Sequence, residues 1–304
     1  MGLNFNSFYK KRSLQSVFFI FTKTFLVQAS RLLFLVIFWA VLHSACKKET
    51  VTPTPNDTST IPNLIPPFFK KNIIIENFKG EWNPNCPTGD DSLQKMYLLD
   101  THKIICVNIH QGDWLAIPSF FMQINSYLGG INGYPRATIN RQTAQYGSQI
   151  DSVLLSIVNW RVNIMPYLIQ TSNVGMALES KIRNDSLFVN LYYASSDTNV
   201  QNCKLTLYLI EHNITAQNQQ SAPTSPYVHH HVLRQVLSQY LGDNVVIENK
   251  KKLKSYSLSL NGTNYKKADL QLVALIHSEG ADYKNHRVLN CIKANVSQTK
   301  NWNE

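Results

Sequence analysis

The sequence predicts an α/β unit over residues 72–170, followed by a mainly β, β-sandwich-like unit over residues 171–304. In the first unit, apolar strand-type runs alternate with segments of helical periodicity, as in strands joined by helical crossovers. In the second, strand-sized blocks follow one another with turn residues between them. The chain of 304 residues is long enough for two domains of ordinary size.

The first unit contains three strand candidates and three helix candidates. Three apolar, β-rich runs have the length of buried strands: Ile73–Ile75, Lys103–His110 and Arg136–Asn140. Three segments repeat apolar residues at helical spacing: Thr88–Leu99, Ser119–Leu128 and Ile150–Met165. Gly129-Gly130 and Pro166 limit the second and third helices. The first helical crossover predicts that the first two strands pair in parallel.

The second unit contains six strand candidates. They alternate or run apolar over strand-sized lengths: Val174–Ile182, Ser186–Tyr193, Lys204–His212, Lys254–Leu260, Asp269–His277 and Arg287–Val296. Asn184-Asp185 and Asn261-Gly262 supply turn residues. A loop around Ala216–Pro226 and a helix at Val232–Tyr240, ended near Gly242, interrupt the strands. An antiparallel β-sandwich is the packing expected for this half.

Composition and charge narrow the classes of protein. A hydrophobic content of 44% and a charged content of 16% are typical of a globular chain. Residues 1–45 hold five basic residues and no acidic one, which leaves +5 of the net charge of +10 for the remainder. That remainder shows no dense basic stripe with interleaved aromatic residues, only the short run Lys250–Lys252. Nucleic-acid binding is therefore disfavoured.

Residues 1–45 have the features of a bacterial signal peptide. The apolar run Leu32–Leu42 has the length of a signal-peptide core, whereas a membrane span needs roughly 20 residues. Small residues before Cys46 resemble a lipobox, in which a diacylglycerol is attached to the cysteine thiol, although His43 departs from that pattern. The alternative is an uncleaved N-terminal anchor helix. Both interpretations place the folded part outside the cytoplasm.

Residues 46–71 are predicted to form a lipid-anchored tether. They are rich in Pro and Thr, a composition that favours extended and hydrated chain over packed structure. Some 20 residues of such chain, at about 3 Å each, would hold a folded domain several nanometres from a membrane.

One stretch of the first unit has features of a redox site. Ile73–Pro87 runs from an apolar strand through a Gly-containing turn to Trp82 and then to Cys86. A strand that enters a helix at a Trp-x-x-x-Cys-Pro turn is the arrangement in which thioredoxin-like domains keep two cysteines. Asn83 stands where the first sulfur is expected. Disulfide exchange needs a thiolate and a second, resolving thiol, so an amide at this position cannot perform it.

Three stretches together resemble a known family: Glu76–Pro87, Asn108–Asp113 and Gly133–Arg141. They are similar to the 28-kilodalton outer-membrane-protein (Omp28-related) lipoproteins of Bacteroidetes-type bacteria, and Tyr227–Arg234 is similar to a further segment of that family. The resemblance spans about Ile73 to Val296. It implies an α/β thioredoxin-like domain followed by a mainly β (β-sandwich-like) C-terminal domain. The family's molecular function is poorly defined, so the resemblance says more about fold than about activity.

The resemblance leaves Cys86 as the candidate catalytic residue. Asn83 is a preferred helix N-cap residue and Pro84 suits the first helical position, so both are expected to keep the helix start. Cys86 would then lie one turn into the helix, where the resolving thiol of a thioredoxin is largely buried. Two interpretations stay open: Cys86 is a small buried hydrophobe, or it is a lone reactive thiol that forms mixed disulfides.

A binding surface is expected near the same corner. Tyr134-Pro135 matches the cis-proline of the thioredoxin fold, which faces the dithiol and offers a backbone edge to an extended peptide. The second strand ends near His110 and Asp113, and ligand crevices in α/β sheets lie beyond strand carboxyl ends. Seven residues could therefore share one surface: Trp82, Asn83, Cys86, His110, Asp113, Tyr134 and Pro135.

Two further patterns have structural alternatives. In His229-His230-His231 the outer two side chains face one way on an extended segment, but a zinc site needs more ligands and none stands at useful local spacing. No metal and no cofactor is expected. Cys203 and Cys291 lie on predicted strands and could form a disulfide if those strands adjoin; the alternative is two buried free thiols.

These observations predict a non-catalytic, lipid-anchored lipoprotein of the cell envelope, at the outer membrane, attached to the membrane through Cys46. A degenerate thioredoxin-like domain and a β-sandwich would serve as a binding or scaffold module for a peptide or an envelope protein, and not for nucleic acid. The alternative is an envelope thiol-disulfide oxidoreductase that acts through the single Cys86.

Overall fold

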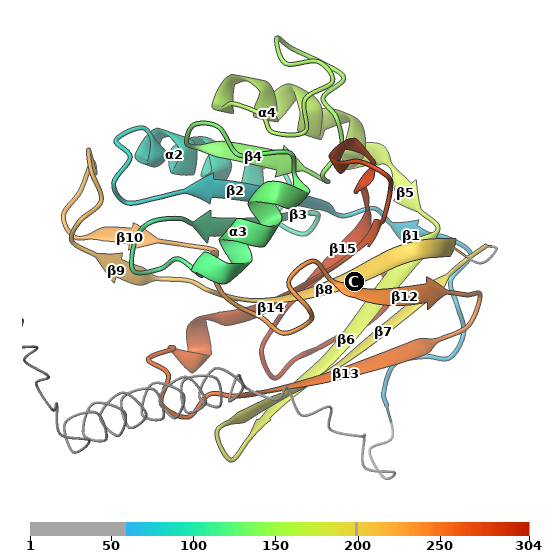
Figure 1. The fold of residues 1–304 in the computed structure, drawn as a ribbon. Helices are drawn as coiled ribbons and strands as arrows, with labels where there is room; N and C mark the ends of the chain where they lie inside the picture. Colours follow the sequence, from blue (N-terminus) through green and yellow to red (C-terminus); the bar gives the residue numbers. More distant parts are fainter. Residues whose placement is uncertain (1–58, 198–199, 304) are drawn as a thin grey trace, which may run out of the picture. The chain divides into compact units, whose positions relative to one another are not determined.

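The structure is a computed structural model that describes residues 59–197 and 200–303, all within one compact unit, Thr50–Glu304 (Figure 1). The expected signal peptide, Cys46 and the first part of the expected tether lie outside the described residues. Among the described helices, none has the length and apolar character needed to cross a membrane.

The fold is a mixed α/β structure with mostly β content. The main sheet has eight strands, in the order β15 (Val288–Asn295), β14 (Leu270–Ser278), β8 (Val200–Glu211), β11 (Val232–Val236), β3 (Ile104–His110), β2 (Ile73–Lys79) and β4 (Arg136–Ile139), with β12 (Asp243–Ile247) also paired to β8. A second sheet has four strands, in the order β13 (Lys252–Ser259), β7 (Ser186–Ser195), β6 (Val174–Arg183) and β16 (Thr299–Lys300). Two small sheets pair β1 (Phe69–Lys70) with β5 (Thr171–Ser172) and β9 (Ile214–Ala216) with β10 (Tyr227–His229).

Helices cover both faces of the main sheet at β2, β3 and β4. The connection from β2 through α2 (Cys86–Tyr97) to β3 makes these strands parallel, as the helical crossover predicts, while β4 is antiparallel to β2. Helices α2 and α4 (Ile157–Ile164) cover one face, with the 3-10 turn Met165–Ile169 after α4. Helix α3 (Pro118–Tyr127) covers the opposite face (Figure 1).

The four-stranded sheet packs against β8, β14 and β15 of the main sheet and forms a β-sandwich with them (Figure 1). Alternate residues of β8 explain this arrangement, because successive side chains of a strand point to opposite faces. Leu205, Leu207 and Leu209 enter the core between the two sheets. Tyr208 and Ile210 join the core under α3. The main sheet therefore contains strands from both sides of the division expected at residue 170.

The helix expected at Val232–Tyr240 is wrong, because the segment contains strand β11. It lies between β3 and β8 and pairs with both. Its register shifts between Leu233 and Gln235, so that Leu233 and Val236 both enter the core under α3. A β-bulge of this kind places apolar residues three apart on one face, which imitates the spacing of a helix. The helix α4 is also shorter than expected and begins at Ile157.

Residues 59–71 are packed against the folded unit and do not form a hydrated tether. Ile61 and Phe69 are buried against the four-stranded sheet, beside Ala177, Tyr192 and Trp302. The Trp302 indole Nε1 donates a hydrogen bond to the Pro62 carbonyl at 3.0 Å. The apolar side chains of Ile61 and Phe69 hold this Pro-rich segment against the protein, because residues of the four-stranded sheet form an apolar surface that receives them.

The disulfide considered between Cys203 and Cys291 is absent, and both residues are buried free thiols. Cys203 lies on β8 and Cys291 on β15, and β14 separates these two strands in the sheet. The two side chains also point to opposite faces, since Cys203 belongs to the core of the sandwich and Cys291 to the core under α3. Bridging them would require Cα atoms within about 7 Å and side chains that face one another.

Candidate functional site

The candidate site lies where β2 passes into α2. Strand β2 ends at Lys79, and α2 begins at Cys86, with Asn85 as its N-cap residue and Pro87 in the first turn. The expectation that Asn83 caps the helix is therefore wrong. The Asn83 Oδ1 atom instead accepts a hydrogen bond from the Asn85 backbone N at 2.9 Å and stabilises the turn before the helix.

Cys86 is the first helical residue and is fully buried. Burial raises the pKa of its thiol, and this effect outweighs the opposite effects of the Gly80 backbone hydrogen bond and the Lys79 charge. A catalytic cysteine has the reverse properties, a lowered pKa and partial exposure. Cys86 therefore has the environment of a core residue.

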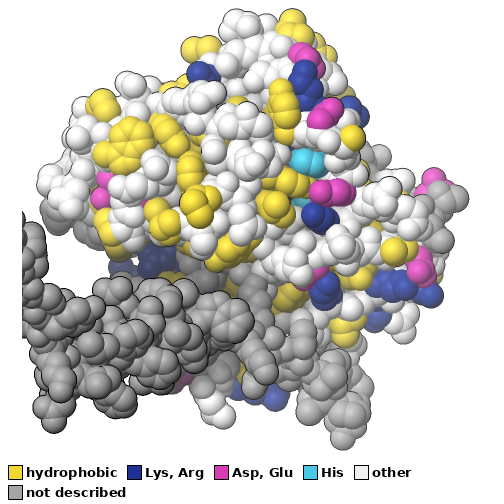
Figure 2. Space-filling model, viewed as in Figure 1, with side chains coloured by type: hydrophobic (Ala, Val, Ile, Leu, Met, Phe, Trp, Pro, Cys, Tyr) yellow, Lys and Arg dark blue, Asp and Glu magenta, His cyan; other side chains and the backbone are white. Residues whose placement is uncertain are grey.

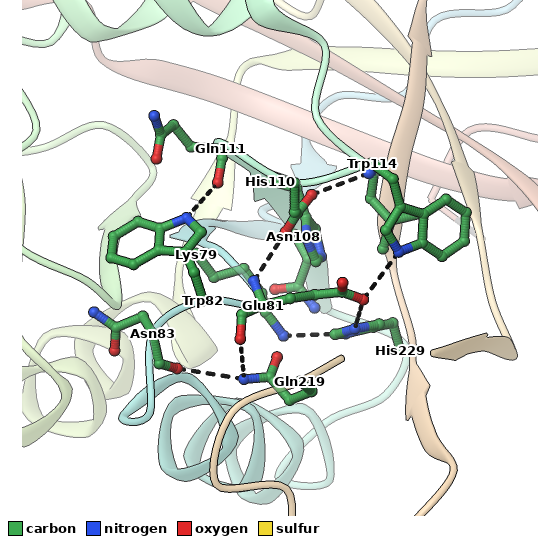
Figure 3. Close-up of polar contacts among 12 residues, drawn as sticks. Lys79, Glu81, Trp82, Asn83, Asn108, His110, Gln111, Trp114, Gln219 and His229 are labelled. Carbon is green, nitrogen blue, oxygen red and sulfur yellow. Dashed lines mark hydrogen bonds and ion pairs between the residues drawn. The ribbon is translucent and has the colours of Figure 1, made fainter. Parts of the chain in front are cut away.

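We call the turn between the end of β2 and the start of α2 the corner, and its exposed edge the rim. The side chains of the rim are mainly aromatic. Trp82 is 40% exposed and its ring centroid lies 5.2 Å from that of Tyr134, in an edge-to-face contact. The Trp82 indole Nε1 donates to the Gln111 carbonyl at 2.8 Å (Figure 3). Gly80 permits this close packing, because a Cβ atom there would lie 2.3 Å from the Trp82 Nε1. The polar edge of the indole is thus satisfied by the protein.

Pro135 lies behind this rim and is buried, after a cis Tyr134–Pro135 peptide bond. It packs on Gly89 of α2 so closely that a Cβ atom at Gly89 would lie 2.6 Å from the Pro135 Cγ. Of the seven residues expected to share one surface, Trp82, Asn83 and Tyr134 form the rim. Four lie beneath it or have their side chains buried: Cys86, His110, Asp113 and Pro135.

His110 and Asp113 form a pair beyond the end of β3. The His110 Nδ1 lies 2.7 Å from the Asp113 Oδ2, which also accepts a hydrogen bond from the Glu81 backbone N at 2.9 Å. Burial lowers the pKa of His110, although Asp113 acts to raise it. Burial acts to raise the pKa of Asp113, but the hydrogen bonds from His110 and the backbone outweigh it, and the pKa of this carboxyl is lowered.

A larger set of buried ionisable groups surrounds this pair and was not expected from the sequence. We call it the buried charge network, and its members are Lys79, Glu81, Asp90, His110, Asp113 and His229. Figure 3 labels four of them, Lys79, Glu81, His110 and His229. Lys79 forms an ion pair with Asp90, which also accepts a hydrogen bond from the Tyr227 hydroxyl at 2.7 Å. The rings of His110 and His229 meet edge to face with centroids 4.9 Å apart.

The hydrogen bonds of His229 assign its tautomer. Lys79 can only donate, so its Nζ donates to the His229 Nδ1 at 3.3 Å. The His229 Nε2 then carries the proton and donates to the Glu81 Oε1 at 3.1 Å, where the Trp114 indole also donates at 3.1 Å. Burial, together with the positive charge of Lys79, lowers the pKa of His229 to about 2. Burial also raises the pKa of Glu81, although the Trp114 hydrogen bond opposes the shift.

This neutral, buried His229 makes the stability of the fold sensitive to acid. An unfolded histidine has a pKa of about 6.5, so below that pH the unfolded chain binds a proton that folded His229, with its pKa of about 2, does not. Stability is therefore expected to fall as the pH drops from 7 to 5, by at most about 1.4 kcal/mol per pH unit for this group. Urea unfolding at several pH values gives the free energy of unfolding as a function of pH. This free energy should fall less steeply between pH 7 and pH 5 in His229→Gln than in His102→Gln, a control at an exposed site. Equal slopes in the two variants would contradict this assignment.

The second half of the chain closes the corner. His229 is the last residue of β10, and the loop between β9 and β10 carries Gln219 and Gln220. The Gln220 backbone N donates to the Glu81 carbonyl at 2.8 Å. The Gln219 Nε2 donates to the Glu81 and Asn83 carbonyls, each at 3.3 Å (Figure 3). The site is thus built from segments that lie far apart in the sequence.

The three consecutive histidines do not act together. His229 joins the buried charge network, whereas His231 has a positive φ of 56° and packs against His212 and Tyr97. Within residues 59–197 and 200–303, no group of three or more His, Cys, Asp or Glu side chains is placed to hold a metal ion. Two sequence signals could have pointed to the buried charge network. His229 belongs to the histidine triplet, and Lys79 is a cation at the end of an apolar strand.

Comparisons with known proteins identify similar chains. A sequence family described as "Outer membrane protein Omp28" matches residues 122–300. A search of curated proteins finds no significant match. The structure is similar to that of HBP35 of Porphyromonas gingivalis, with a TM-score of 0.65 and 21% identity over 77% of each chain.

Two further solved structures match at lower similarity. A protein from Agrobacterium tumefaciens has a TM-score of 0.49 and 14% identity, and covers 74% of this chain and 94% of its own. A domain of the outer membrane lipoprotein Omp28 from P. gingivalis has a TM-score of 0.30 and 14% identity, and covers 41% of this chain and 89% of its own.

Proposed function

This chain belongs to the Omp28 family of outer membrane proteins, and from that premise we propose that it is a non-catalytic, lipid-anchored binding or scaffold protein of the cell envelope. Its α/β part would be a degenerate thioredoxin-like domain and its second half a β-sandwich. The arrangement of β2, α2, β3 and β4 supports the first assignment. The packing of the four-stranded sheet on β8, β14 and β15 supports the second.

The state of Cys86 is the observation that carries the proposal. The position of a thioredoxin nucleophile is occupied by Asn83, and the remaining thiol is fully buried, with a pKa raised by that burial. A thiol that is neither ionised nor accessible cannot attack a disulfide at a useful rate. The strand-to-helix corner is therefore retained as structure, and the chemistry of a dithiol is not.

The rim of the corner supports a binding role. Trp82 is 40% exposed and Trp114 is 54% exposed, and both indole N–H groups are bonded inward, to Gln111 and Glu81. Exposed ring faces with satisfied polar edges suit contact with a peptide or a protein, since aromatic residues are enriched in interface cores. Glu81 of the buried charge network holds the Trp114 ring, and the Gln111 carbonyl holds the Trp82 ring. We assign the expected peptide or envelope-protein partner to this rim.

Thiol reactivity tests the proposal against the alternative, an oxidoreductase that acts through Cys86. We expect no reduction of insulin disulfides by the purified protein, and no reaction of Cys86 with a thiol reagent until the protein is unfolded by denaturant. Cys86→Ser should leave the absence of insulin reduction unchanged and should only lower the number of thiols titrated in denaturant by one, and Cys106→Ser, at a core thiol on β3, is the matched control. Insulin reduction that Cys86→Ser abolishes and Cys106→Ser retains would overturn the non-catalytic assignment.

A further inference from the structure

We propose that a pocket beside the free edge of β15 binds the carboxyl end of a peptide chain. We call it the edge pocket. Its volume is about 160 Å³, and it lies between β15, the residues that precede β2 and β3, and the turn from β15 to β16. The inference goes beyond the proposed function, because the edge pocket shares no residue with the aromatic rim.

The backbone of β15 offers unpaired hydrogen-bonding groups to this pocket. Among the described strands, β15 pairs with β14 alone and ends the main sheet. In an antiparallel pair, successive residues turn their backbone groups alternately toward the partner strand and away from it. The Val296 backbone N donates to the Leu270 carbonyl of β14 at 3.2 Å, so Lys293 and Asn295 face away from β14. Lys293 therefore presents both its N–H and its C=O to the edge pocket.

Both ends of this free edge are closed. On one side, the Asn72 side chain donates to the Cys291 carbonyl at 2.8 Å. On the other side, the Gln298 backbone N donates to the Asn295 carbonyl at 3.2 Å. The N–H and C=O of Lys293, with the Asn295 N–H beside them, are what remains open. An opening of this length is too short for a whole added strand, but it suits the last residues of a chain.

Lys300 supplies a cation to the edge pocket. It pairs with Leu178 across β16 and β6, so its side chain lies on the same face of the sheet as Leu178, toward the main sheet. Its ammonium group forms no hydrogen bond or ion pair within the part of the chain that the structure describes. The described residues that line the pocket include four with carboxamide side chains and no Asp or Glu. This balance of charge favours an anionic ligand.

A second cation without a carboxylate partner lies at the same place. The Lys293 Nζ donates to the Thr101 carbonyl at 2.7 Å, the Ile104 carbonyl at 3.1 Å and the Tyr97 hydroxyl at 3.4 Å, all of them uncharged groups. Burial lowers the pKa of Lys293, and the charge of Lys300 acts in the same direction. A bound anion would offset the repulsion between these two ammonium groups.

The carboxyl end of a peptide combines the two features that the pocket offers. A peptide group in extended conformation exchanges two hydrogen bonds with the backbone of Lys293, as in the addition of a strand to a sheet edge. The terminal carboxylate then accepts a charge-assisted hydrogen bond from Lys300. The pocket volume of about 160 Å³ is the share of about five water molecules in the liquid, which suits the end of a chain and not a long segment.

The edge pocket and the aromatic rim differ in the groups that they would recognise. Figure 2 shows hydrophobic side chains gathered on the side where Figure 1 places α2 and α3. The rim on that side suits apolar side chains. The edge pocket offers a strand edge, carboxamides and cations, and therefore suits the main chain and a charged end.

Peptide titration followed by nuclear magnetic resonance tests the proposal. The full-length protein, with its lysines labelled with ¹⁵N, is titrated with acetyl-tetraalanine that has a free carboxylate or a carboxamide at its end. Alanine is sufficient, because the proposed contacts involve only the main chain and the terminus. We expect the free carboxylate form to shift the backbone amide signal of Lys293, identified with Lys293→Arg. The carboxamide form should bind about tenfold more weakly, the effect of one hydrogen bond to a charged group.

Matched variants isolate the contribution of the pocket. Lys300→Gln should reduce the affinity for the free carboxylate form to that for the carboxamide form, while Lys300→Arg should retain most of it. Gln298→Trp, at an exposed position of the lining, should block both peptides by filling the pocket. Lys95→Gln removes the same charge from an exposed site on α2 and should change nothing.

Three results would overturn the proposal. Equal affinity for the two peptides would show that the terminal carboxylate is not recognised. A shift of the Lys293 signal by acetate or inorganic phosphate, at the same concentrations as by the peptide, would show a simple anion site and refute the assignment to a chain end. Absence of any shift at millimolar peptide would refute the edge pocket as a binding site.

Discussion

Arg141→Met is expected to lower the free energy of unfolding by about 3–5 kcal/mol, the cost of leaving one charge of a buried ion pair without its partner. Arg141 follows β4 and Glu76 lies on β2, and both side chains are almost completely buried. The Arg141 Nε and Nη2 atoms donate to the two Glu76 oxygens, each at 2.7 Å. The Tyr208 hydroxyl and the Thr138 hydroxyl donate to the same carboxylate at 3.0 and 3.1 Å.

The ionisation of Glu76 makes this cost large. Burial acts to raise the pKa of Glu76, but the charge and hydrogen bonds of Arg141 outweigh it, and the pKa is lowered. The carboxylate therefore stays charged at neutral pH, and its stabilising contribution is lost only as the pH falls through the lowered folded-state pKa. Urea unfolding followed by tryptophan fluorescence measures the effect.

Two variants serve as controls for Arg141→Met. Arg161→Met, at an exposed position of α4, should stay within about 0.5 kcal/mol of the wild type. The double variant Glu76→Gln, Arg141→Met should be more stable than Arg141→Met alone, because it leaves no buried charge. A loss below about 1 kcal/mol for Arg141→Met would show that the pair is hydrated and not buried as described.

Lys79→Met is expected to be the second most damaging change, with a loss of about 2–4 kcal/mol. The Lys79 side chain is fully buried, and its removal leaves Asp90 with the Tyr227 hydroxyl alone and leaves the His229 Nδ1 without its donor. We expect a smaller loss of unfolding free energy than for Arg141→Met, because the Asp90 side chain is 19% exposed and water can solvate it.

Helix α2 offers a matched control for Lys79→Met. Lys95 and Asp91 form an ion pair at 2.6 Å on the same helix, with side chains 73% and 59% exposed. Lys95→Met should cost no more than about 0.5 kcal/mol, because exposed pairs contribute little. Similar losses for Lys79→Met and Lys95→Met in urea unfolding would show that burial does not set the strength of the Lys79–Asp90 pair.

Strands with strong local patterns were predictable from the sequence. The β-branched run that forms β3 and the alternating residues of β7 needed only their neighbours in the chain. Strand β11 was not predictable, because the bulge between Leu233 and Gln235 gives it the spacing of a helix. Residues 59–71 were misjudged for a different reason: their Pro-rich composition is that of a linker, and the surface that binds Ile61 is formed by distant residues.

The candidate site was predictable only in part, for the same physical reason. The turn that contains Trp82 and Cys86 is formed by consecutive residues, so the sequence alone could predict it. The partners of its buried charges could not, since His229 and Gln219 reach Glu81 from more than 100 positions away. The helix start was also displaced by two residues, because Asn83 and Asn85 have equal propensity to cap a helix.

Strand β3 carries a consequence for how the protein matures. The edge of β3 that faces β11 is paired by residues far along the chain. The Asn108 side chain donates a hydrogen bond to the His230 carbonyl at 2.8 Å, 122 positions later, and the Asn108 backbone N donates to the His231 carbonyl at 2.7 Å. Contacts of such long range form slowly, because loop closure precedes them. An unpaired strand edge is open to association with other chains while it waits. We therefore expect this edge of the first half to stay open until the second half supplies β11.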